Sequence, residues 1–270
     1  MDKTKYFDKV KEYKILAKHE VGQNFLISEK DAGRIVGFCE IKDTDKVLEI
    51  GSGAGSLSVF LTDYSADATL LDIDEGLVTK LQNDFQDYPN IHPTLGNALK
   101  ADYSNYDIII GNLPYYITSS LIEKIALEAK SCRKAVLMVQ KEAFLRLSAN
   151  IGTEDYGPLP ILLSYVGKIK REFLVPRDSF VPAPHIDSIV FTITFDPDLN
   201  FDIAKDLYSF VGQMFLHRRK TIFNNLQFLT KDGEKAKNIL EKAGILPTAR
   251  PETLSLDNYL SLLVSYKSLN

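Results

Sequence analysis

Short hydrophobic runs alternate with helix-length segments through the first half of this chain. The runs cover residues 46–50, 68–74, 91–99, 106–111 and 134–140, and segments 55–64, 75–85 and 119–130 have helical spacing. Strand–helix alternation is typical of a parallel sheet with helices on both faces. A period-two pattern over residues 187–195 indicates an edge or antiparallel strand. We therefore expect an α/β, Rossmann-like sheet that is mostly parallel with an antiparallel edge.

The character of the chain changes near residue 196. The residues that follow are predicted to form consecutive helices, over 203–216, 219–229, 234–244 and 256–269. We place a domain boundary there, so that residues 1–196 form the α/β domain and residues 197–270 a small helical domain. A length of 270 residues fits one large domain with one small one.

Charge and cysteine content narrow the functional classes. The net charge of −4 excludes a globally basic nucleic-acid binder, although lysines cluster before residue 19 and other cations cluster in GKIKREFLVPR and FLHRRK. Cys39 and Cys132 have neither disulfide nor metal-ligand spacing, so we expect free thiols and no metal site. With no secretory signal and no membrane-length apolar run, we expect a cytoplasmic protein.

A glycine-rich segment, VLEIGSGAGSLS, separates the first predicted strand from the first predicted helix. Gly51 and Gly53 allow the main chain to turn tightly and approach a ligand, and a helix start offers free N–H groups. Asp72 ends the second predicted strand about 20 residues later, where an acid binds a ribose diol. A tight turn that binds no ligand is the weaker alternative, because Asp72 stands at the spacing from the glycines that a ribose-binding acid has.

The ligand could be a nicotinamide cofactor or a nucleoside without phosphate. The spacing G-x-G-x-G differs from the dinucleotide pattern, and Glu49, just before the first glycine, would repel a pyrophosphate. An acid there suits a cation such as S-adenosylmethionine. Asn97, after the third strand, could hydrogen-bond the edge of an adenine, or it could be only a turn residue.

The segment IIIGNLPYYITSS ends a buried strand in Asn112, Leu113, Pro114 and Tyr115. In open α/β sheets, ligands bind at the edge formed by the carboxyl ends of the strands. The Asn112 side-chain oxygen and a main-chain carbonyl near Leu113 could accept hydrogen bonds from an adenine amino group, which frees its lone pair for methyl transfer without a general base. Pro114 stiffens the loop, and an extruded base could stack on Tyr115, a contact worth about 1–3 kcal/mol. Each residue alone also fits a turn or core packing; the combination favours methyl transfer.

The chain resembles the rRNA adenine N6,N6-dimethyltransferases, closest to their bacterial small-subunit branch. The resemblance covers nearly the whole chain. It rests on GQNFL (22–26), EIGSGAG (49–55), NLPYYI (112–117), VQKEAFLRL (139–147), YGPLPILLSY (156–165), FVPAPHIDSIV (180–190) and FLHRRKTIFNNL (215–226). The last two segments lie outside any generic methyltransferase pattern.

The resemblance implies a class I methyltransferase fold and particular contacts. S-adenosylmethionine would be bound by Asn24, Leu26, Gly51, Asp72, Asn97 and Asn112, with Asn97 standing where the family usually has Asp. Phe180 would stack on the opposite face of the target adenine from Tyr115.

The resemblance also implies the substrate. Two methyl groups would go to each of two adjacent adenines in the 3′-terminal hairpin of small-subunit rRNA, within a pre-30S particle, late in 30S biogenesis. The chain would act as a monomer, with residues 197–270 recognising rRNA. The N-terminal lysines and Arg218, Arg219 and Lys220 would contact phosphates.

Three other functions fit part of the sequence. Large-subunit rRNA dimethyltransferases that confer macrolide resistance share these motifs, but RRKTIFNNL and GILPTARPETLS (244–255) favour the small-subunit branch. A ribosome-assembly factor with an idle site is disfavoured by the intact Asn112–Tyr115 loop. A nicotinamide oxidoreductase would leave that loop unexplained.

Overall fold

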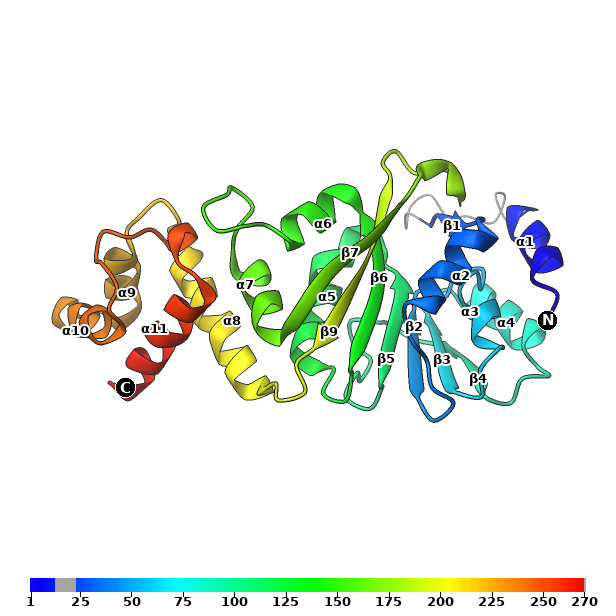
Figure 1. Ribbon diagram of the computed structural model, residues 1–270, viewed down its shortest axis with the longest axis horizontal. Coiled ribbons are helices and arrows are strands. Elements are labelled where there is room, and N and C mark those ends of the chain that lie inside the picture. Colours follow the sequence, from blue (N-terminus) through cyan, green and yellow to red (C-terminus); the bar gives the residue numbers. More distant parts are fainter. Residues whose placement is uncertain (13–22, 270) are drawn as a thin grey trace. The chain divides into compact units, whose positions relative to one another are not determined.

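The computed structural model describes residues 1–12 and 23–269 (Figure 1). Within these residues, seven strands form one sheet in the order β4-β3-β2-β5-β6-β9-β7. Strands β4, β3, β2, β5 and β6 pair in parallel, and β9 pairs antiparallel with β6. The predicted α/β sheet with an antiparallel addition is confirmed.

Apart from β7, the strands of the large sheet agree with the predicted runs. Those of the large sheet are Lys46–Ile50 (β2), Asp67–Asp72 (β3), Ile91–Leu95 (β4), Ile108–Asn112 (β5), Lys134–Gln140 (β6), Gly167–Val175 (β7) and Ser188–Phe195 (β9). Two short strands, Phe25–Leu26 (β1) and Phe180–Val181 (β8), pair antiparallel with each other.

Helices follow most strands. They are Lys3–Glu12 (α1), Glu29–Gly37 (α2), Ser58–Leu61 (α3), Glu75–Asp84 (α4), Thr118–Glu128 (α5), Lys141–Leu147 (α6), Pro158–Val166 (α7), Phe201–Phe215 (α8), Ile222–Thr230 (α9), Gly233–Ala243 (α10) and Leu256–Ser268 (α11). Short 3₁₀ helices cover Tyr115–Ile117 (η3), Arg177–Ser179 (η4) and Pro251–Thr253 (η5). No helix of the described residues is long and apolar enough to cross a lipid bilayer.

The sheet owes its central strands to unbroken apolar runs. Ile108, Ile109 and Ile110 are fully buried in β5, as a strand covered on both faces requires. Ile108 and Ile110 belong to the core that also contains buried side chains of α1 to α4. Ile109 points to the other face, behind which Figure 1 draws α5. Helices on both faces leave the carboxyl ends of the parallel strands as the open edge.

Two local predictions differ from the structure. The helix predicted over residues 55–64 is confined to α3, because positive φ angles at Gly51, Gly53 and Gly55 extend the loop to residue 57. The segment GKIKREFLVPR was interpreted only as a basic cluster, yet it contains β7. Its charged residues alternate with Ile169, Phe173 and Val175, which is the pattern of a half-covered strand.

The chain divides into two compact units. Residues 1–144 and 168–197 form the first, and residues 145–167 and 198–270 form the second. Residues 145–167 had been assigned to the first domain. They belong with the helical unit because Tyr156 and Ile161 are buried in its core, and the Tyr156 hydroxyl donates to the Leu254 carbonyl at 3.0 Å.

Side-chain caps define where four helices of the second unit begin. Asn200, Thr221, Asp232 and Ser255 precede α8, α9, α10 and α11, and each accepts a hydrogen bond from a main-chain N–H of its helix. Such caps satisfy donors that a helix leaves unpaired. The helices then bury one face each around Leu207, Val211 and Tyr259.

Gly111 provides a test of strand packing. A Cβ atom at this position would lie 2.6 Å from the Ile50 carbonyl oxygen, and main chain cannot give way there. We expect Gly111→Ala to lower the free energy of unfolding by about 1–3 kcal/mol, measured by urea unfolding. At Gly37, an added Cβ atom would have no atom of another part of the chain within 4 Å. Gly37→Ala should therefore change the free energy of unfolding by less than about 1 kcal/mol. Equal effects of the two substitutions would contradict this account.

Candidate active site

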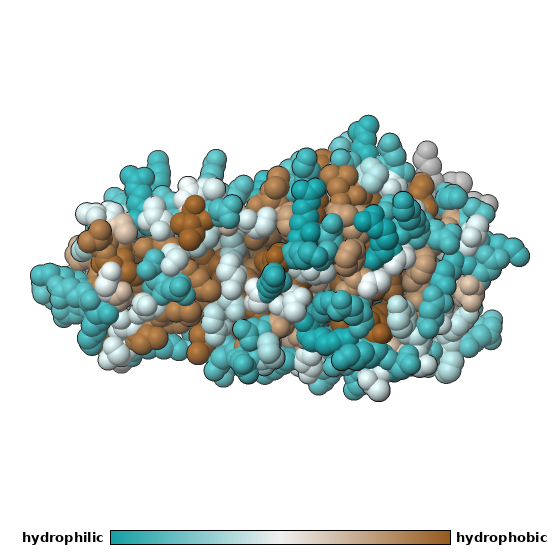
Figure 2. Space-filling model, viewed as in Figure 1, coloured by the Kyte–Doolittle hydropathy of each residue, from teal (hydrophilic) through white to brown (hydrophobic). Residues whose placement is uncertain are grey.

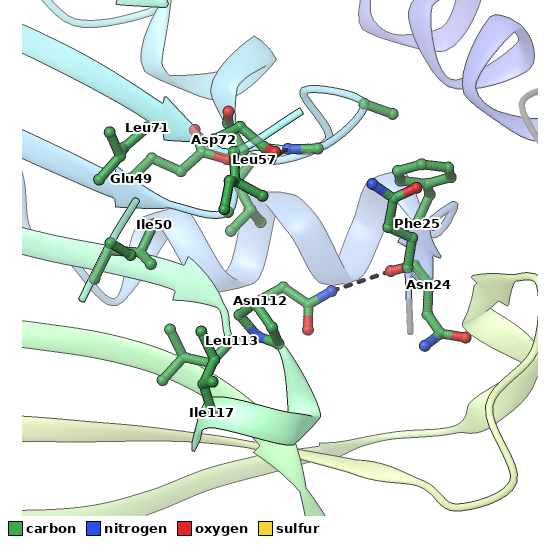
Figure 3. Close-up of a pocket in the computed structure, with 18 of the residues that line it drawn as sticks. Asn24, Phe25, Glu49, Ile50, Leu57, Leu71, Asp72, Asn112, Leu113 and Ile117 are labelled. Atoms are coloured by element: carbon green, nitrogen blue, oxygen red, sulfur yellow. Dashed lines mark hydrogen bonds between the residues drawn. The ribbon is translucent and has the colours of Figure 1, made fainter. Parts of the chain in front are cut away.

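A cavity of about 320 Å³ opens at the carboxyl ends of β2, β3, β4 and β5 (Figure 3). Its walls come from residues 23–26, 49–54, 56–57, 71–73, 96–99 and 112–117. Every residue predicted to contact a cofactor or a target base lines this cavity, with the exception of Phe180. The fold therefore brings together segments that are nearly 100 residues apart in sequence.

The glycine loop forms one wall. Gly51 and Gly53 have φ angles of +69° and +54°, in the left-handed region that favours glycine. The Gly51 N–H donates to the Leu71 carbonyl at 2.8 Å, and the Gly53 N–H donates to Oδ2 of Asp72 at 2.7 Å. These bonds hold the loop against the end of β3, with its main chain along the cavity.

Asp72 is the last residue of β3 and is buried. Its Oδ2 accepts from Gly53, and its Oδ1 accepts from the Asp74 N–H at 2.9 Å. Burial raises the pKa of this carboxyl, and the two N–H donors act against the rise. Because a carboxylate oxygen accepts more than one hydrogen bond, both oxygens keep the capacity to bind ligand hydroxyls.

Glu49 is a buried acid in the same wall, with only 1% of its surface exposed. The Ser58 hydroxyl donates to its Oε2 at 2.6 Å. Burial raises the pKa of Glu49 to about 8, and the nearby charge of Asp72 adds to the rise. A cation in the cavity would favour the ionised form of Glu49, whereas an anion there would disfavour it.

Asn112 ends β5 at the opposite wall. Its Nδ2 donates to the main-chain carbonyl of Asn24 at 3.2 Å, the bond drawn in Figure 3. That bond fixes which way the amide points. Its Oδ1 is buried and has no hydrogen-bond partner among the described residues. Buried polar atoms are rarely left unpaired, so this oxygen is available to a donor entering the cavity.

The loop after Asn112 is held rigidly. The Leu113 N–H donates to the Met138 carbonyl at 3.0 Å, and the Thr118 hydroxyl donates to the Pro114 carbonyl at 3.0 Å. Tyr115 is half-buried, and burial raises its pKa. Tyr116 is 62% exposed. The loop thus places two aromatic rings in the cavity lining, one sheltered and one at the surface.

Sequence reasoning missed the apolar part of the lining. Ile73 and Leu99 are 61% and 38% exposed although both are large hydrophobic residues, and both line the cavity. Ile73 directly follows Asp72 at the end of β3, and an apolar residue at that place was the available signal for it; Leu99 lies two residues after Asn97, in the loop beyond β4. The Asn97 Oδ1 accepts from the Leu99 N–H at 2.9 Å, which leaves its Nδ2 for a ligand.

The N-terminal motif contributes its last residues to the site. The Leu26 carbonyl accepts from the Ser56 hydroxyl at 2.7 Å, and the Asn24 carbonyl accepts from Asn112. Both residues line the cavity, as predicted. Gly22, the first residue of the GQNFL motif, lies outside the described residues.

Phe180 differs from its predicted position. Its ring is 2% exposed within the core of the first unit, and its main chain pairs with Leu26 in the β1–β8 ladder. It is absent from the cavity lining. With this geometry the ring has no face open to a base, so the predicted stacking requires β8 to move.

The basic residues predicted to contact phosphates fall into two groups. In α1, Lys3 pairs with Asp63 and Lys11 with Asp8. Lys14 and Lys18 lie outside the described residues. In the second unit, Arg218 is engaged internally, because its guanidinium donates to the carbonyls of Thr153 and Glu154. This engagement is a correction to the prediction that all three cations of Arg218–Lys220 bind phosphate.

Comparison with known families gives a consistent result. The family model described as ribosomal RNA adenine dimethylase matches residues 15–268. Ribosomal RNA small subunit methyltransferase A of Malacoplasma penetrans is 35% identical to this chain, and the match covers 99% of this chain and 98% of that protein. The protein of the same name from Clostridium botulinum is 34% identical over 93% of this chain and 94% of its own length.

Solved structures show the same similarity. A dimethyladenosine transferase from Plasmodium falciparum has a TM-score of 0.78 and 27% identity, with 90% of this chain and 97% of that chain covered. The 23S rRNA methyltransferase ErmE has a TM-score of 0.66 and 26% identity, with 90% and 99% covered. No group of three or more His, Cys, Asp or Glu side chains in the described part of the chain could hold a metal ion.

Glu49 predicts a pH effect on stability. Between its ordinary pKa of 4.5 and about 8, the folded chain keeps a proton that the unfolded chain has lost, so rising pH across this window favours unfolding. We expect Glu49→Gln to remove that loss and to be more stable than the parent at pH 8, by a difference on the order of a few kcal/mol. Urea unfolding from pH 5 to 9 measures it, and parallel curves for the two proteins would contradict the assignment.

Proposed function

The chain belongs to the ribosomal RNA adenine dimethylase family, and on that premise we propose which adenines it modifies and how its residues act. As a member of that family it is an S-adenosylmethionine-dependent rRNA adenine dimethyltransferase. The proposed target is a pair of adjacent adenines in the 3′-terminal hairpin of small-subunit rRNA, each receiving two methyl groups on its 6-amino nitrogen.

The cavity suits S-adenosylmethionine by its chemistry. Asp72 offers carboxylate oxygens to the ribose hydroxyls, and Ile73 and Leu99 offer apolar contact to the adenine ring. The Nδ2 of Asn97 is free to donate to a ring nitrogen, whereas an aspartate there could only accept. Glu49 supplies negative charge toward a cationic ligand. The bound cofactor supplies a methyl group activated by its positively charged sulfur.

The single observation that carries the proposal is the orientation of Asn112. Its Nδ2 is committed to the Asn24 carbonyl, which leaves the buried Oδ1 as an acceptor in the cavity. An adenine amino group is a weak nucleophile because its lone pair is conjugated with the ring. An acceptor for its N–H, prepositioned in a buried site, favours the tetrahedral nitrogen that attacks the methyl group. A main-chain carbonyl near Leu113 would accept the second N–H.

To reach this acceptor, the target base has to be extruded from the RNA helix or from between its stacked neighbours. Tyr115 offers a ring in the cavity lining on which the extruded base would stack. The ring is held by a loop that is anchored to β6 at one end and capped by Thr118 at the other. After methyl transfer the charged amine loses its proton to water, so no side chain is required as a general base.

The small subunit is the preferred substrate because of the late segments of the sequence. RRKTIFNNL and GILPTARPETLS (244–255) favour the small-subunit branch, and the two relatives compared above carry small-subunit names. We assign rRNA selection to the helical residues 197–270 of a chain acting as a monomer. The substrate would be a pre-30S particle late in its assembly, in the cytoplasm.

A methylation assay tests the proposal. The purified chain is incubated with labelled S-adenosylmethionine and either 30S subunits lacking adenine dimethylation, 50S subunits or naked rRNA. We expect dimethyladenine in the 30S reaction. Asn112→Ala should lower kcat by about 100-fold or more, because it removes a preorganised acceptor that acts in the transition state.

Two controls separate the possible causes of a loss. Asn105→Ala removes an exposed asparagine outside the cavity and should keep full activity. Calorimetry with S-adenosylmethionine shows whether the Asn112 variant still binds cofactor. Label in 50S rRNA would assign the chain to the large-subunit branch. Cofactor binding without methylation of any RNA would mean a binding factor with an idle site.

A further inference from the structure

The turn between α8 and α9, together with the exposed side of α9, presents rings beside cations in the second unit. His217 and Phe228 are both exposed, with ring centroids 4.8 Å apart and an interplanar angle of 53°. Phe228 is 59% exposed, and Leu216 beside His217 is 66% exposed. Figure 2 shows hydrophobic side chains at the surface over this helical part of the chain. We call Leu216, His217, Arg219, Lys220 and Phe228 the α9 patch.

The α9 patch rests on a rigid base. Asn225 is buried at 2% exposure, and its Nδ2 donates to the carbonyls of His217 at 3.3 Å and Thr221 at 3.1 Å. The Lys220 N–H donates to the same His217 carbonyl at 2.8 Å. These bonds tie the turn to the first turn of α9, so His217 is held where its ring meets Phe228.

The charge of this segment is one-sided. Residues 216–231 contain Arg218, Arg219, Lys220 and Lys231 and no aspartate or glutamate, in a chain whose net charge is −4. Arg218 is engaged with carbonyls of the unit. Arg219 and Lys220 are exposed and form no ion pair within the described residues. Two cations are therefore available to an anionic partner next to the exposed rings.

From these observations we propose that the α9 patch binds an unpaired nucleotide of rRNA, distinct from the methylated adenines. The base stacks on Phe228, and the flanking phosphates contact Arg219 and Lys220. Aromatic rings beside cations are how proteins hold unpaired nucleotides, because every base has a face to stack and every nucleotide has a phosphate. This inference rests on the proposed rRNA substrate. A nucleotide is favoured over a protein partner because it supplies both a flat base for the ring and a phosphate for the cations.

Binding of the full-length chain to undermethylated 30S subunits tests the inference. Phe228→Leu keeps an apolar side chain but removes the ring, and it should weaken binding by about 5- to 100-fold, the range of one base stack. Phe228→Trp should keep or increase the affinity. Val264→Ala, at a residue of α11 that is 69% exposed, is the matched control and should have no effect.

Salt dependence separates stacking from phosphate contact. A double variant, Arg219→Gln with Lys220→Gln, should reduce the slope of log affinity against log salt, and Phe228→Leu should leave that slope unchanged. Ultraviolet crosslinking should join Phe228 to a nucleotide. Unchanged affinity of Phe228→Leu, or a crosslink to a ribosomal protein instead of RNA, would overturn the inference.

The same measurements distinguish this inference from the proposed function. If the parent chain methylates 30S subunits while Phe228→Leu binds them equally well, only the role of the α9 patch is overturned. If the parent chain neither binds nor methylates them, the proposed function is overturned and this inference with it. Equal binding of S-adenosylmethionine by parent and variant confirms that the substitution leaves the first unit intact.

Discussion

The close approach of β5 to β2 is the contact on which the cavity depends. Gly111 lies opposite Ile50 in the parallel ladder, and a side chain there would collide with the Ile50 carbonyl. Because Gly111 has no side chain, the two strands can lie this close, and β5 ends at Asn112 beside the glycine loop. A Cβ atom on Gly51 would lie 3.5 Å from the Asn112 carbonyl oxygen. A glycine within β5 and a glycine just after β2 therefore bring Asn112 and the glycine loop into one cavity.

Burial of Glu49 and Asp72 makes a cationic ligand more favourable in this cavity than an anionic one. Glu49 and Asp72 both have raised pKa values because the fold removes water from their carboxyl groups. Ionising them in the folded chain is unfavourable without a partner, and it becomes favourable when a cation occupies the cavity. The folded chain is thus less stable at neutral pH than it would be with an amide in place of Glu49. A cationic cofactor recovers part of that free energy on binding, whereas a dinucleotide phosphate would add to the repulsion.

The parts that were predictable from sequence are those in which the signal is local. Apolar runs identified β2, β3, β5 and β6. Asp72 and Asn112 were recognised as site residues because they end two of these strands, and parallel strands bring their carboxyl ends to one edge of the sheet. The conformation of Phe180 was not predictable from the motif alone, because its burial depends on the pairing of β8 with β1. Residues 145–167 were placed in the wrong unit for a similar reason: their partners, such as Leu254, are about 100 residues away in sequence.

The hydrogen bond that orients the Asn112 side chain was not predictable from the sequence either. The bond from Asn112 to the Asn24 carbonyl joins residues 88 positions apart, and it decides which end of the amide faces the cavity. The motif predicted the residue type, whereas the chemistry depends on the orientation. Main-chain groups carry no sequence signature, so an interaction made through the Asn24 carbonyl appears only when the tertiary structure is known.

The two units have opposite electrostatic tasks. A cavity walled by two acids, and lined by no lysine or arginine of the described residues, gives the RNA backbone no electrostatic attraction. Affinity for RNA depends largely on phosphate contacts, which an acidic chain has to provide locally. Residues 216–231, which contain cations and no acids, are where we propose these contacts in the helical unit. Under that proposal, the cationic cofactor and the anionic RNA backbone would meet opposite kinds of charge in separate units.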